Sequence, residues 1–302
     1  MYILGFDIGG TKSAVVTASW DGDRVEVLKK DKCPTDRSID PYAMIDRLIS
    51  MADALLDRKP DAIGISCGGP LDSGKGVIMS PPNLPEWDGI EIVDYIEKHY
   101  GVKAHLQNDA NACALAEWKF GAGKGSRNMV FMTFGTGLGA GLILNGELYE
   151  GTNGNAGEVG HIRLKPDGPV GFGKAGSFEG FCSGGGIAQI GKALGFEGDE
   201  NGVINAKTIA DAAYLGNEKA LETYRVSGEM LGHGLSVLID ILNPEVIVIG
   251  SVFARSRDLL WHEAEKIIEK EALSVSSGCC RVVPAQLGES IGDFGAIATA
   301  LV

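Results

Sequence analysis

Two glycine-rich segments have the residue types of phosphate-binding turns. The first is Asp7-Ile8-Gly9-Gly10-Thr11-Lys12, and the second is Thr133-Phe134-Gly135-Thr136-Gly137-Leu138-Gly139. Glycines let backbone amides approach an anion closely, and the hydroxyls and Lys12 add donors and positive charge. Asp7 could hold a phosphate-bound magnesium ion, directly or through water. Either turn alone is more often structural, but two of one design predict a pair of loops that grip one polyphosphate from opposite domains.

A polar cluster, Gln107-Asn108-Asp109-Ala110-Asn111, ends an apolar strand and opens a helix. A single Asn or Asp at such a place is best interpreted as a helix N-cap. Three of them within four positions exceed what one cap needs, and α/β sheets bind ligands at the carboxyl ends of their strands. Asp109 is therefore a candidate general base that accepts a proton from an attacking hydroxyl in phosphoryl transfer.

The segment Gly157-Glu158-Val159-Gly160-His161 is a candidate polyol-binding loop. Glu accepts hydrogen bonds from sugar hydroxyls, and His donates or accepts them. A metal site built on this pair alone lacks a further His or Cys at suitable spacing. The alternative interpretation of the segment by itself is a surface Glu and an unrelated His.

Two other turns carry weaker signals. The rigid turn at residues 81–87 contains Trp87, which could line a sugar pocket or anchor the turn to the core. The apolar strand after Asn243-Pro244 opens at Gly250 and Ser251 into a small-residue turn, which could admit a flat base.

These segments must be positioned by strands and helices, and the sequence repeats one arrangement. Residues 2–28 and 129–149 each read as strand, glycine turn, strand, two-residue turn and third strand. The two-residue turns, Asp21-Gly22 and Asn145-Gly146, are strong hairpin signals. Two β-meanders of one design predict a duplicated architecture.

Helix-like and strand-like segments alternate after each meander, which predicts an α/β fold. We expect strands near residues 61–67, 102–107, 245–250 and 281–286, and helices near 41–56, 90–100, 109–120, 218–241, 259–268 and 292–301. The predicted domains are residues 1–115, completed by the C-terminal helix at about 290–302, and residues 116–289.

Composition narrows the function classes. The chain has 302 residues, of which 44 are glycine, and a net charge of −13, which argues against a nucleic-acid binder. No apolar run is long enough to cross a membrane, and the N-terminus does not read as a signal peptide. The six cysteines show no CxxC spacing, so we expect a cytoplasmic protein.

Taken together, the motifs resemble the ROK family of sugar kinases and repressors, within the actin/hexokinase-like superfold. The resemblance covers essentially the whole chain. It rests on DIGGTK (7–12), GGPLD (68–72), PNLPEW (82–87), NDANA (108–112), TFGTGLGAG (133–141), GNAGEVGH (154–161), Glu179 before Cys182-Ser183-Gly184, and NPEVIVIG (243–250).

The resemblance implies a two-domain actin-like ATPase fold of duplicated, ribonuclease H-like α/β design, with ATP and sugar in the interdomain cleft. It implies ATP and Mg²⁺ as cofactors, with Asp109 as the base. The implied nucleotide-binding residues are Asp7, Gly9, Gly10, Thr11, Lys12, Thr133, Gly135, Thr136, Gly137, Gly250 and Ser251. The implied sugar-binding residues are Gly69, Asn83, Asn108, Asp109, Glu158, His161 and Glu179.

One segment departs from the family pattern. ROK proteins usually place three zinc-binding cysteines after the His, and alignment on the surrounding glycines puts Val170, Phe172 and Ser177 at those positions. None of these can be a thiolate ligand, so we predict no zinc. We expect Val170 and Phe172 to pack into the protein body and hold the loop instead.

The leading hypothesis is an ATP-dependent kinase that phosphorylates a glucose-like hexose at its 6-hydroxyl. An N-acylmannosamine or other hexosamine kinase is the closest alternative, and a fructokinase is less favoured. A ROK-type sugar-responsive regulator without its DNA-binding domain represents a different class. An inactive sugar-binding module is disfavoured by the intact Asp109 and phosphate turns. By resemblance we also expect a homodimer whose partners are sugar and ATP, with no nucleic acid and no membrane.

Overall fold

The computed structural model describes residues 1–302, which form two compact units. Unit 1 comprises residues 1–125, 148–156 and 287–302, and unit 2 comprises residues 126–147 and 157–286. Residue 115, where the sequence analysis placed the boundary, lies within helix α3 (Asp109–Phe120), and unit 1 continues to Gly125. The return of residues 148–156 to unit 1 was not predicted.

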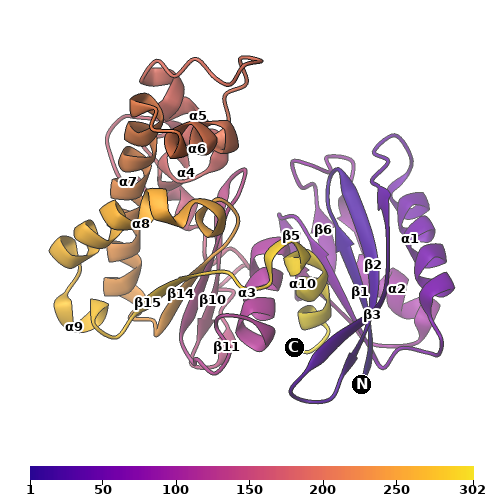
Figure 1. Cartoon of the computed structure of the whole chain (residues 1–302). Helices are drawn as coiled ribbons and strands as arrows, with labels where there is room; N and C mark the ends of the chain where they lie inside the picture. The colour runs from indigo at the N-terminus through magenta and orange to yellow at the C-terminus, as the bar shows by residue number, and fades with distance from the viewer. The chain divides into compact units, whose positions relative to one another are not determined.

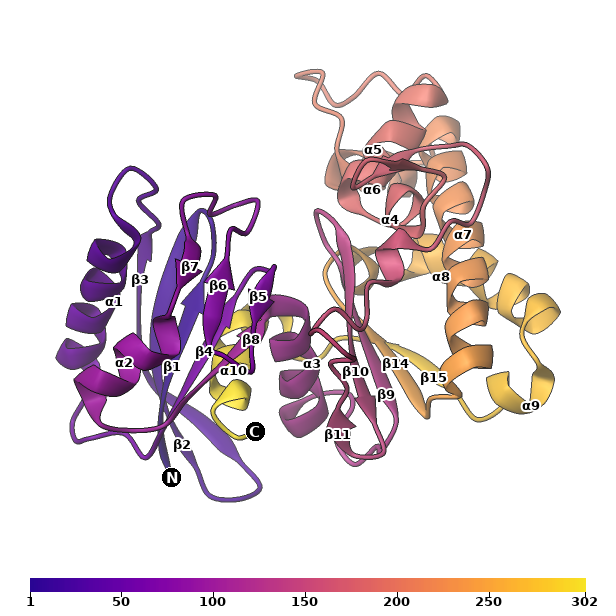
Figure 2. The same cartoon turned by 180° about the vertical axis from the view of Figure 1, so that it is seen from behind.

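Unit 1 is built on a five-stranded sheet in the order β3-β2-β1-β4-β8 (Figures 1 and 2). Strands β1 (Tyr2–Ile8), β2 (Lys12–Trp20) and β3 (Val25–Pro34) form the antiparallel meander. Strands β4 (Ala62–Cys67) and β8 (Ala104–Asn108) continue the sheet in parallel with β1. The carboxyl ends of β1, β4 and β8 therefore meet at one edge of the sheet.

Helices cover both faces of this sheet. Helices α1 (Pro41–Leu55) and α2 (Ile92–Tyr100) bury their apolar stripes against one face, beside Leu4 and Phe6. The C-terminal helix α10 (Ile291–Thr299) packs with Ile3 on the opposite face. Its approach is close, since a Cβ at Gly64 would lie 2.0 Å from the carbonyl oxygen of Ala296.

Unit 2 repeats the design with a sheet in the order β11-β10-β9-β14-β15 (Figure 2). Its meander is β9 (Met129–Phe134), β10 (Leu138–Leu144) and β11 (Glu147–Leu148), and β14 (Val246–Ile249) and β15 (Arg281–Pro284) add parallel strands. The long helices α7 (Glu218–Leu242) and α8 (Val252–Glu271) pack against each other. The matching strand orders confirm the duplicated α/β architecture.

Smaller elements decorate each unit. Unit 1 contains a three-stranded sheet of β5 (Leu71–Asp72), β6 (Val77–Met79) and β7 (Asp88–Ile90), and the short helix η2 (Gly288–Ser290). Unit 2 contains the hairpin β12 (Val170–Gly171) and β13 (Lys174–Ala175), and helices η1 (Val159–His161), α4 (Phe178–Phe181), α5 (Gly184–Ala193), α6 (Ala206–Tyr214) and α9 (Ser274–Ser277). No helix is both long and apolar enough to cross a membrane.

Candidate active site

The first glycine turn joins β1 to β2 at the edge of the unit 1 sheet where the carboxyl ends of β1, β4 and β8 meet. The amide of Gly9 donates to the carbonyl of Lys12 (3.1 Å), which closes the turn, and Thr11 and Lys12 are exposed. Thr35 braces it from β3's end, because its hydroxyl donates to the carbonyl of Gly9 (2.6 Å). The hydroxyl and ammonium group are thus free to face an anion.

The 81–87 turn packs directly onto this glycine turn. A Cβ at Gly10 would lie 2.4 Å from the Cβ of Asn83, so only glycine permits this contact. Trp87 is 2% exposed and belongs to the unit 1 core. Of the two roles considered from sequence, Trp87 therefore anchors the turn, and Asn83 remains exposed beside Gly10.

Asp7 lies at the carboxyl end of β1 in an unfavourable environment for a carboxylate. Its pKa is raised from 3.8 to about 6, chiefly by burial and then by the negative charges of Asp293 and Asp109, while the charge of Lys30 opposes the rise. Lys30 forms an ion pair with the buried Asp293 (2.5 Å). One carboxylate suits a magnesium ion held mainly by phosphates and water, and such a cation would favour the ionised form of Asp7.

Asn108 and Asp109 lie at the carboxyl end of β8, as predicted. Asn108 is the N-cap of α3, where its side-chain oxygen accepts from the amide of Asn111 (2.8 Å). The N-cap interpretation is therefore correct for Asn108, but it leaves Asp109 for another role. Gly69, which follows β4, lies beside Asn108, because its Cβ would be 4.0 Å from that of Asn108.

The Asp109 carboxylate is exposed and is oriented by its own helix. The amide of Ala110 donates to Oδ1 (2.8 Å) and lowers the pKa, but desolvation by the surrounding protein is larger and raises it. The side chain keeps contact with solvent, so a hydroxyl of a bound ligand can reach it, as a general base requires.

A partly buried hydrogen-bond network supports the end of β8. Glu150 Oε1 accepts from the Gln107 amide (2.9 Å) and from the Ser73 hydroxyl (2.5 Å). Gln107 in turn accepts from the Asn111 amide (3.2 Å). The 148–156 segment therefore braces the strand that carries Asp109, a role that no sequence signal indicated.

The second glycine turn joins β9 to β10 in unit 2, at the place that corresponds to the first. Thr133 closes it, since its hydroxyl oxygen accepts from the amide of Gly139 (3.0 Å). Thr136 is exposed at the tip. Thr133 is thus a structural residue of the turn, and Thr136 is its available hydroxyl.

The amino-terminal end of α5 lies beside this second turn, which the sequence analysis missed. The amide of Gly184 donates to the carbonyl of Gly135 (2.7 Å), and Ser183 caps the helix through the amide of Gly186 (2.9 Å). Helix amino termini favour anions. The signal in the sequence was a Ser followed by three glycines at 183–186, which is typical of a capped helix start open to a ligand.

Gly250 and Ser251 form the turn from β14 into α8. Ser251 has φ +53° and ψ −112°, a conformation that favours glycine, and its side chain makes no capping hydrogen bond. A Cβ at Gly135 would lie 3.7 Å from the Ser251 hydroxyl, so this turn adjoins the second glycine turn.

The predicted sugar residues of unit 2 gather around the second glycine turn. Glu158 and His161 are exposed at the ends of η1. Glu179 Oε2 accepts from the amide of Leu138 (3.0 Å), which leaves its second oxygen for a ligand. Asp7, the first turn, Gly69, Asn83, Asn108 and Asp109 are brought together in unit 1, and Thr133–Gly137, Glu158, His161, Glu179, Gly250 and Ser251 in unit 2.

The loop between His161 and Glu179 corrects one expectation. Val170 is 47% exposed and Phe172 is 73% exposed, so neither packs into the body. Backbone and side-chain hydrogen bonds hold the loop instead. Phe172 lies in the turn of the β12–β13 hairpin, whose strands have two residues each, and its side chain points away from the core. The predicted absence of zinc stays a prediction.

Two polar side chains, Ser177 and Gln189, stabilise the loop in the way that was expected of Val170 and Phe172. Ser177 is fully buried and caps α4 by accepting from the amide of Gly180 (3.0 Å). The Gln189 amide pairs with the backbone of Val170 in both directions, at 2.9 Å each. Hydrogen bonds therefore fix both ends of the hairpin.

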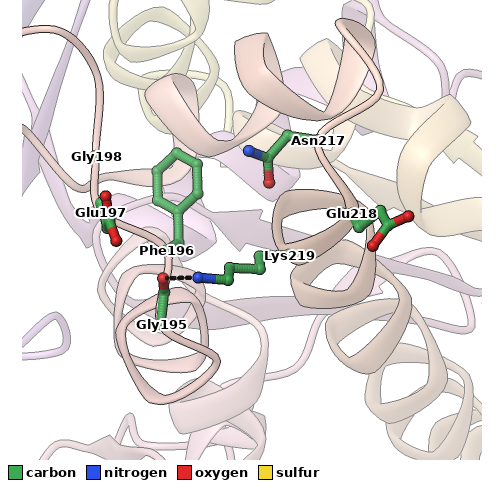
Figure 3. Close-up of a pocket in the computed structure, with 7 residues that line it drawn as sticks. All are labelled: Gly195, Phe196, Glu197, Gly198, Asn217, Glu218 and Lys219. Atoms are coloured by element: carbon green, nitrogen blue, oxygen red, sulfur yellow. Dashed lines mark hydrogen bonds between the residues drawn. The ribbon is translucent and has the colours of Figure 1, made fainter.

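A pocket of about 440 Å³ lies elsewhere in unit 2, at the end of α5 and the start of α7 (Figure 3). It is lined by Gly195, Phe196, Glu197, Gly198, Asn217, Glu218 and Lys219. The Lys219 ammonium donates to the Gly195 carbonyl (2.7 Å), and Asn217 caps α7. Because these polar groups are already paired and no predicted site residue lines the pocket, we assign it no catalytic role.

Comparison with known proteins identifies one family, and relatives are similar to this chain over nearly its whole length. The profile described as the ROK family matches residues 3–302. A glucokinase from Streptomyces coelicolor is 32% identical over 310 residues, covering 97% of this chain and 95% of that protein.

Two solved structures are similar over almost all of this chain. One is a ROK family glucokinase from Streptomyces griseus in complex with glucose and AMPPNP, with a TM-score of 0.78 and 29% identity, covering 100% of this chain and 99% of that one. The other is a ROK family transcriptional regulator, a homologue of the E. coli MLC protein, with a TM-score of 0.86 and 27% identity, covering 99% of this chain and 78% of that one.

Proposed function

The chain belongs to the ROK family and is an ATP-dependent sugar kinase, and we propose that its acceptor is a glucose-like hexose phosphorylated at the 6-hydroxyl. The observation that carries the proposal is the exposed Asp109 carboxylate at the carboxyl end of β8. It lies close enough to Asp7 for its negative charge to raise the pKa of Asp7. A kinase needs a base beside a phosphate site, and we propose Asp109 for the first role and Asp7 for the second.

In the proposed mechanism Asp109 accepts the proton of the sugar's 6-hydroxyl as the oxygen attacks the γ-phosphorus. The bond between the γ-phosphorus and the β,γ-bridging oxygen breaks, and ADP leaves with that oxygen. The amide of Ala110 and the start of α3 orient the carboxylate. Asn108, Gly69 beside it, and Asn83 against the first glycine turn belong to the same unit and are proposed to contact the sugar. Positioning and charge stabilisation account for most of the catalysis in phosphoryl transfer.

The two glycine turns are proposed to bind the ATP phosphates. In the first, Gly9, Gly10, Thr11 and Lys12 supply amides, a hydroxyl and a charge. In the second, Gly135, Thr136 and Gly137 do the same, helped by the start of α5. Magnesium bound to the phosphates supplies charge neutralisation, and Asp7 is the residue that would hold it.

Glu158, His161 and Glu179 are proposed to bind further sugar hydroxyls. Glu179 also links sugar to nucleotide, since its bond to the Leu138 amide ties the sugar loop to the second glycine turn. Gly250 and Ser251 are proposed to border the adenosine. The homodimer and the cytoplasmic location remain predictions from the resemblance.

The test is ADP release by purified protein with ATP and magnesium across a panel of sugars. The panel contains glucose, mannose, fructose, N-acetylglucosamine, N-acetylmannosamine and 6-deoxyglucose. We expect turnover with glucose and none with 6-deoxyglucose, which lacks the acceptor hydroxyl. Turnover with N-acetylmannosamine alone would move the assignment to a hexosamine kinase, and no turnover with any sugar would refute the proposal.

A further inference from the structure

Phe172 combines two features that a purely structural residue lacks. Its side chain is 73% exposed, and its backbone lies in the left-handed region at φ +42°. It is the first of the two turn residues between β12 and β13, and Gly173 follows at φ +75°. Two-residue hairpin turns with both φ values positive favour Asn-Gly, so an exposed aromatic residue here is strained. Strain of this kind is found at functional sites.

The Phe172 ring lies at the proposed sugar site. Its edge contacts His161, with ring centroids 5.3 Å apart and planes at 72°. The Lys174 ammonium donates to the carbonyl of His161 (2.6 Å), which fixes the turn against that residue. A Cβ at Gly171 would lie 2.7 Å from the Cβ of Glu179, so the hairpin also packs on the second proposed sugar ligand.

We propose that Phe172 is a sugar-contact residue that determines acceptor specificity. Its ring offers an apolar surface to the C–H groups of a neutral sugar next to the hydroxyls bound by His161 and Glu179. This inference rests on the proposed function of the same site. Binding sites combine a few polar groups with aromatic surfaces, and all other side chains assigned to the sugar here are polar or glycine.

The strain makes the role separable from folding. Replacing Phe172 by Asn creates the Asn-Gly pair that the turn prefers and removes the ring. A merely structural phenylalanine would lower the melting temperature when lost, whereas a strained contact residue would not. Phe172→Tyr keeps the ring, and Val170→Ala removes another exposed apolar side chain of the same hairpin as the matched control.

The experiment measures steady-state kinetics and melting temperature for the wild type and these three variants. We expect Phe172→Asn to raise the KM for the accepted sugar about tenfold or more, with the KM for ATP within about twofold and an unchanged or higher melting temperature. Phe172→Tyr, which keeps the ring, should restore most of the sugar affinity that Phe172→Asn loses, and Val170→Ala should behave like the wild type. A loss confined to N-acetyl sugars would place the ring on the acyl methyl group, whereas a loss with every accepted sugar would place it on the ring C–H groups.

Three results would overturn the inference. These are an unchanged sugar KM in Phe172→Asn, equal rises in the KM of sugar and ATP, and a fall of several degrees in melting temperature. Calorimetry with sugar alone separates this inference from the kinase proposal. If the wild type binds sugar without turnover, the kinase proposal fails and the same comparison is made on sugar affinity. If the wild type binds no sugar, both fail.

Discussion

At the scale of single residues, Asp7 illustrates how a proposed active-site carboxylate can lower the stability of the fold. Asp7 is held at a sheet edge among other negative charges, and this placement is unfavourable for folding. The site gains a carboxylate next to the phosphate turn in return. Such a trade is testable because the unfavourable term depends on pH.

We predict that Asp7→Asn stabilises the protein at neutral pH while it abolishes turnover. A pKa raised from 3.8 to about 6 means that the native state binds an extra proton between these values, so stability falls as pH rises through this window. Above pH 6 the full loss is reached, and the free energy of unfolding is lower by about 3 kcal/mol. Melting temperatures without nucleotide or magnesium should show a variant advantage that grows from pH 4 to pH 7. A constant difference would contradict the assignment.

A second residue-scale prediction concerns Ser251. Its backbone conformation favours glycine, and its side chain makes no capping bond that would be lost. Ser251→Gly should therefore raise the free energy of unfolding by about 1 kcal/mol. This value is the gain from relieved backbone strain minus the cost of the greater conformational entropy of glycine in the unfolded chain. Ser251→Ala keeps the strain and serves as the control in the same denaturation experiment. If both variants lose stability equally, the strain is not real.

Residue types alone did not reveal which hydroxyls and carboxylates are occupied. Thr133 and Thr136 look equivalent in sequence, yet Thr133 closes its turn and Thr136 is exposed. Asn108 caps a helix, and the adjacent Asp109 does not. These differences arise from strand register and helix start, which depend on contacts distant in the sequence.

At the scale of elements, the loop between His161 and Glu179 is the part that sequence reasoning misjudged. The sequence showed the glycines of this loop and the absence of the usual cysteines, and it suggested that Val170 and Phe172 pack into the protein body. The structure leaves both exposed and uses Ser177 and Gln189 instead. Gln189 is 19 positions from Val170, so no local pattern pointed to it.

We predict that Gln189→Ala loosens this loop with little effect on the fold. The variant loses two hydrogen bonds to the Val170 backbone on an exposed surface, worth roughly 1 kcal/mol together, and the KM for sugar should rise about fivefold. Hydrogen exchange should increase at residues 165–176. Lys192→Ala, on the same helix and also exposed, should change neither quantity. An unaffected loop would show that other contacts suffice.

At the scale of the whole molecule, duplication explains why so much of the fold was predictable. The matching two-residue turns made both meanders recognisable in the sequence, and the two sheets have equivalent strand orders. The small β5–β7 sheet and the return of residues 148–156 to unit 1 were not foreseen. These parts lack a periodic pattern, and the Glu150 network that fixes the return is a tertiary contact.

The division into units predicts where a core defect will be felt. Gly64→Val should push α10 from the unit 1 sheet, because a Cβ there already lies 2.0 Å from the Ala296 carbonyl. Hydrogen exchange should rise in β1, β4 and α10 while β9 and β14 stay protected. Gly74→Ala, whose added methyl meets only a side-chain oxygen at 3.6 Å, is the control. Uniform loss of protection in both units would contradict their separate cores.

The proposed role of Asp109 as the base of a sugar kinase can be tested with two measurements on one variant. The turnover number of Asp109→Asn is measured by ADP release with glucose, and its glucose affinity is measured by calorimetry without ATP. We expect the turnover number to fall by about a thousandfold, with glucose affinity within about threefold of the wild type. A variant that keeps more than a tenth of the wild-type turnover would contradict the claim.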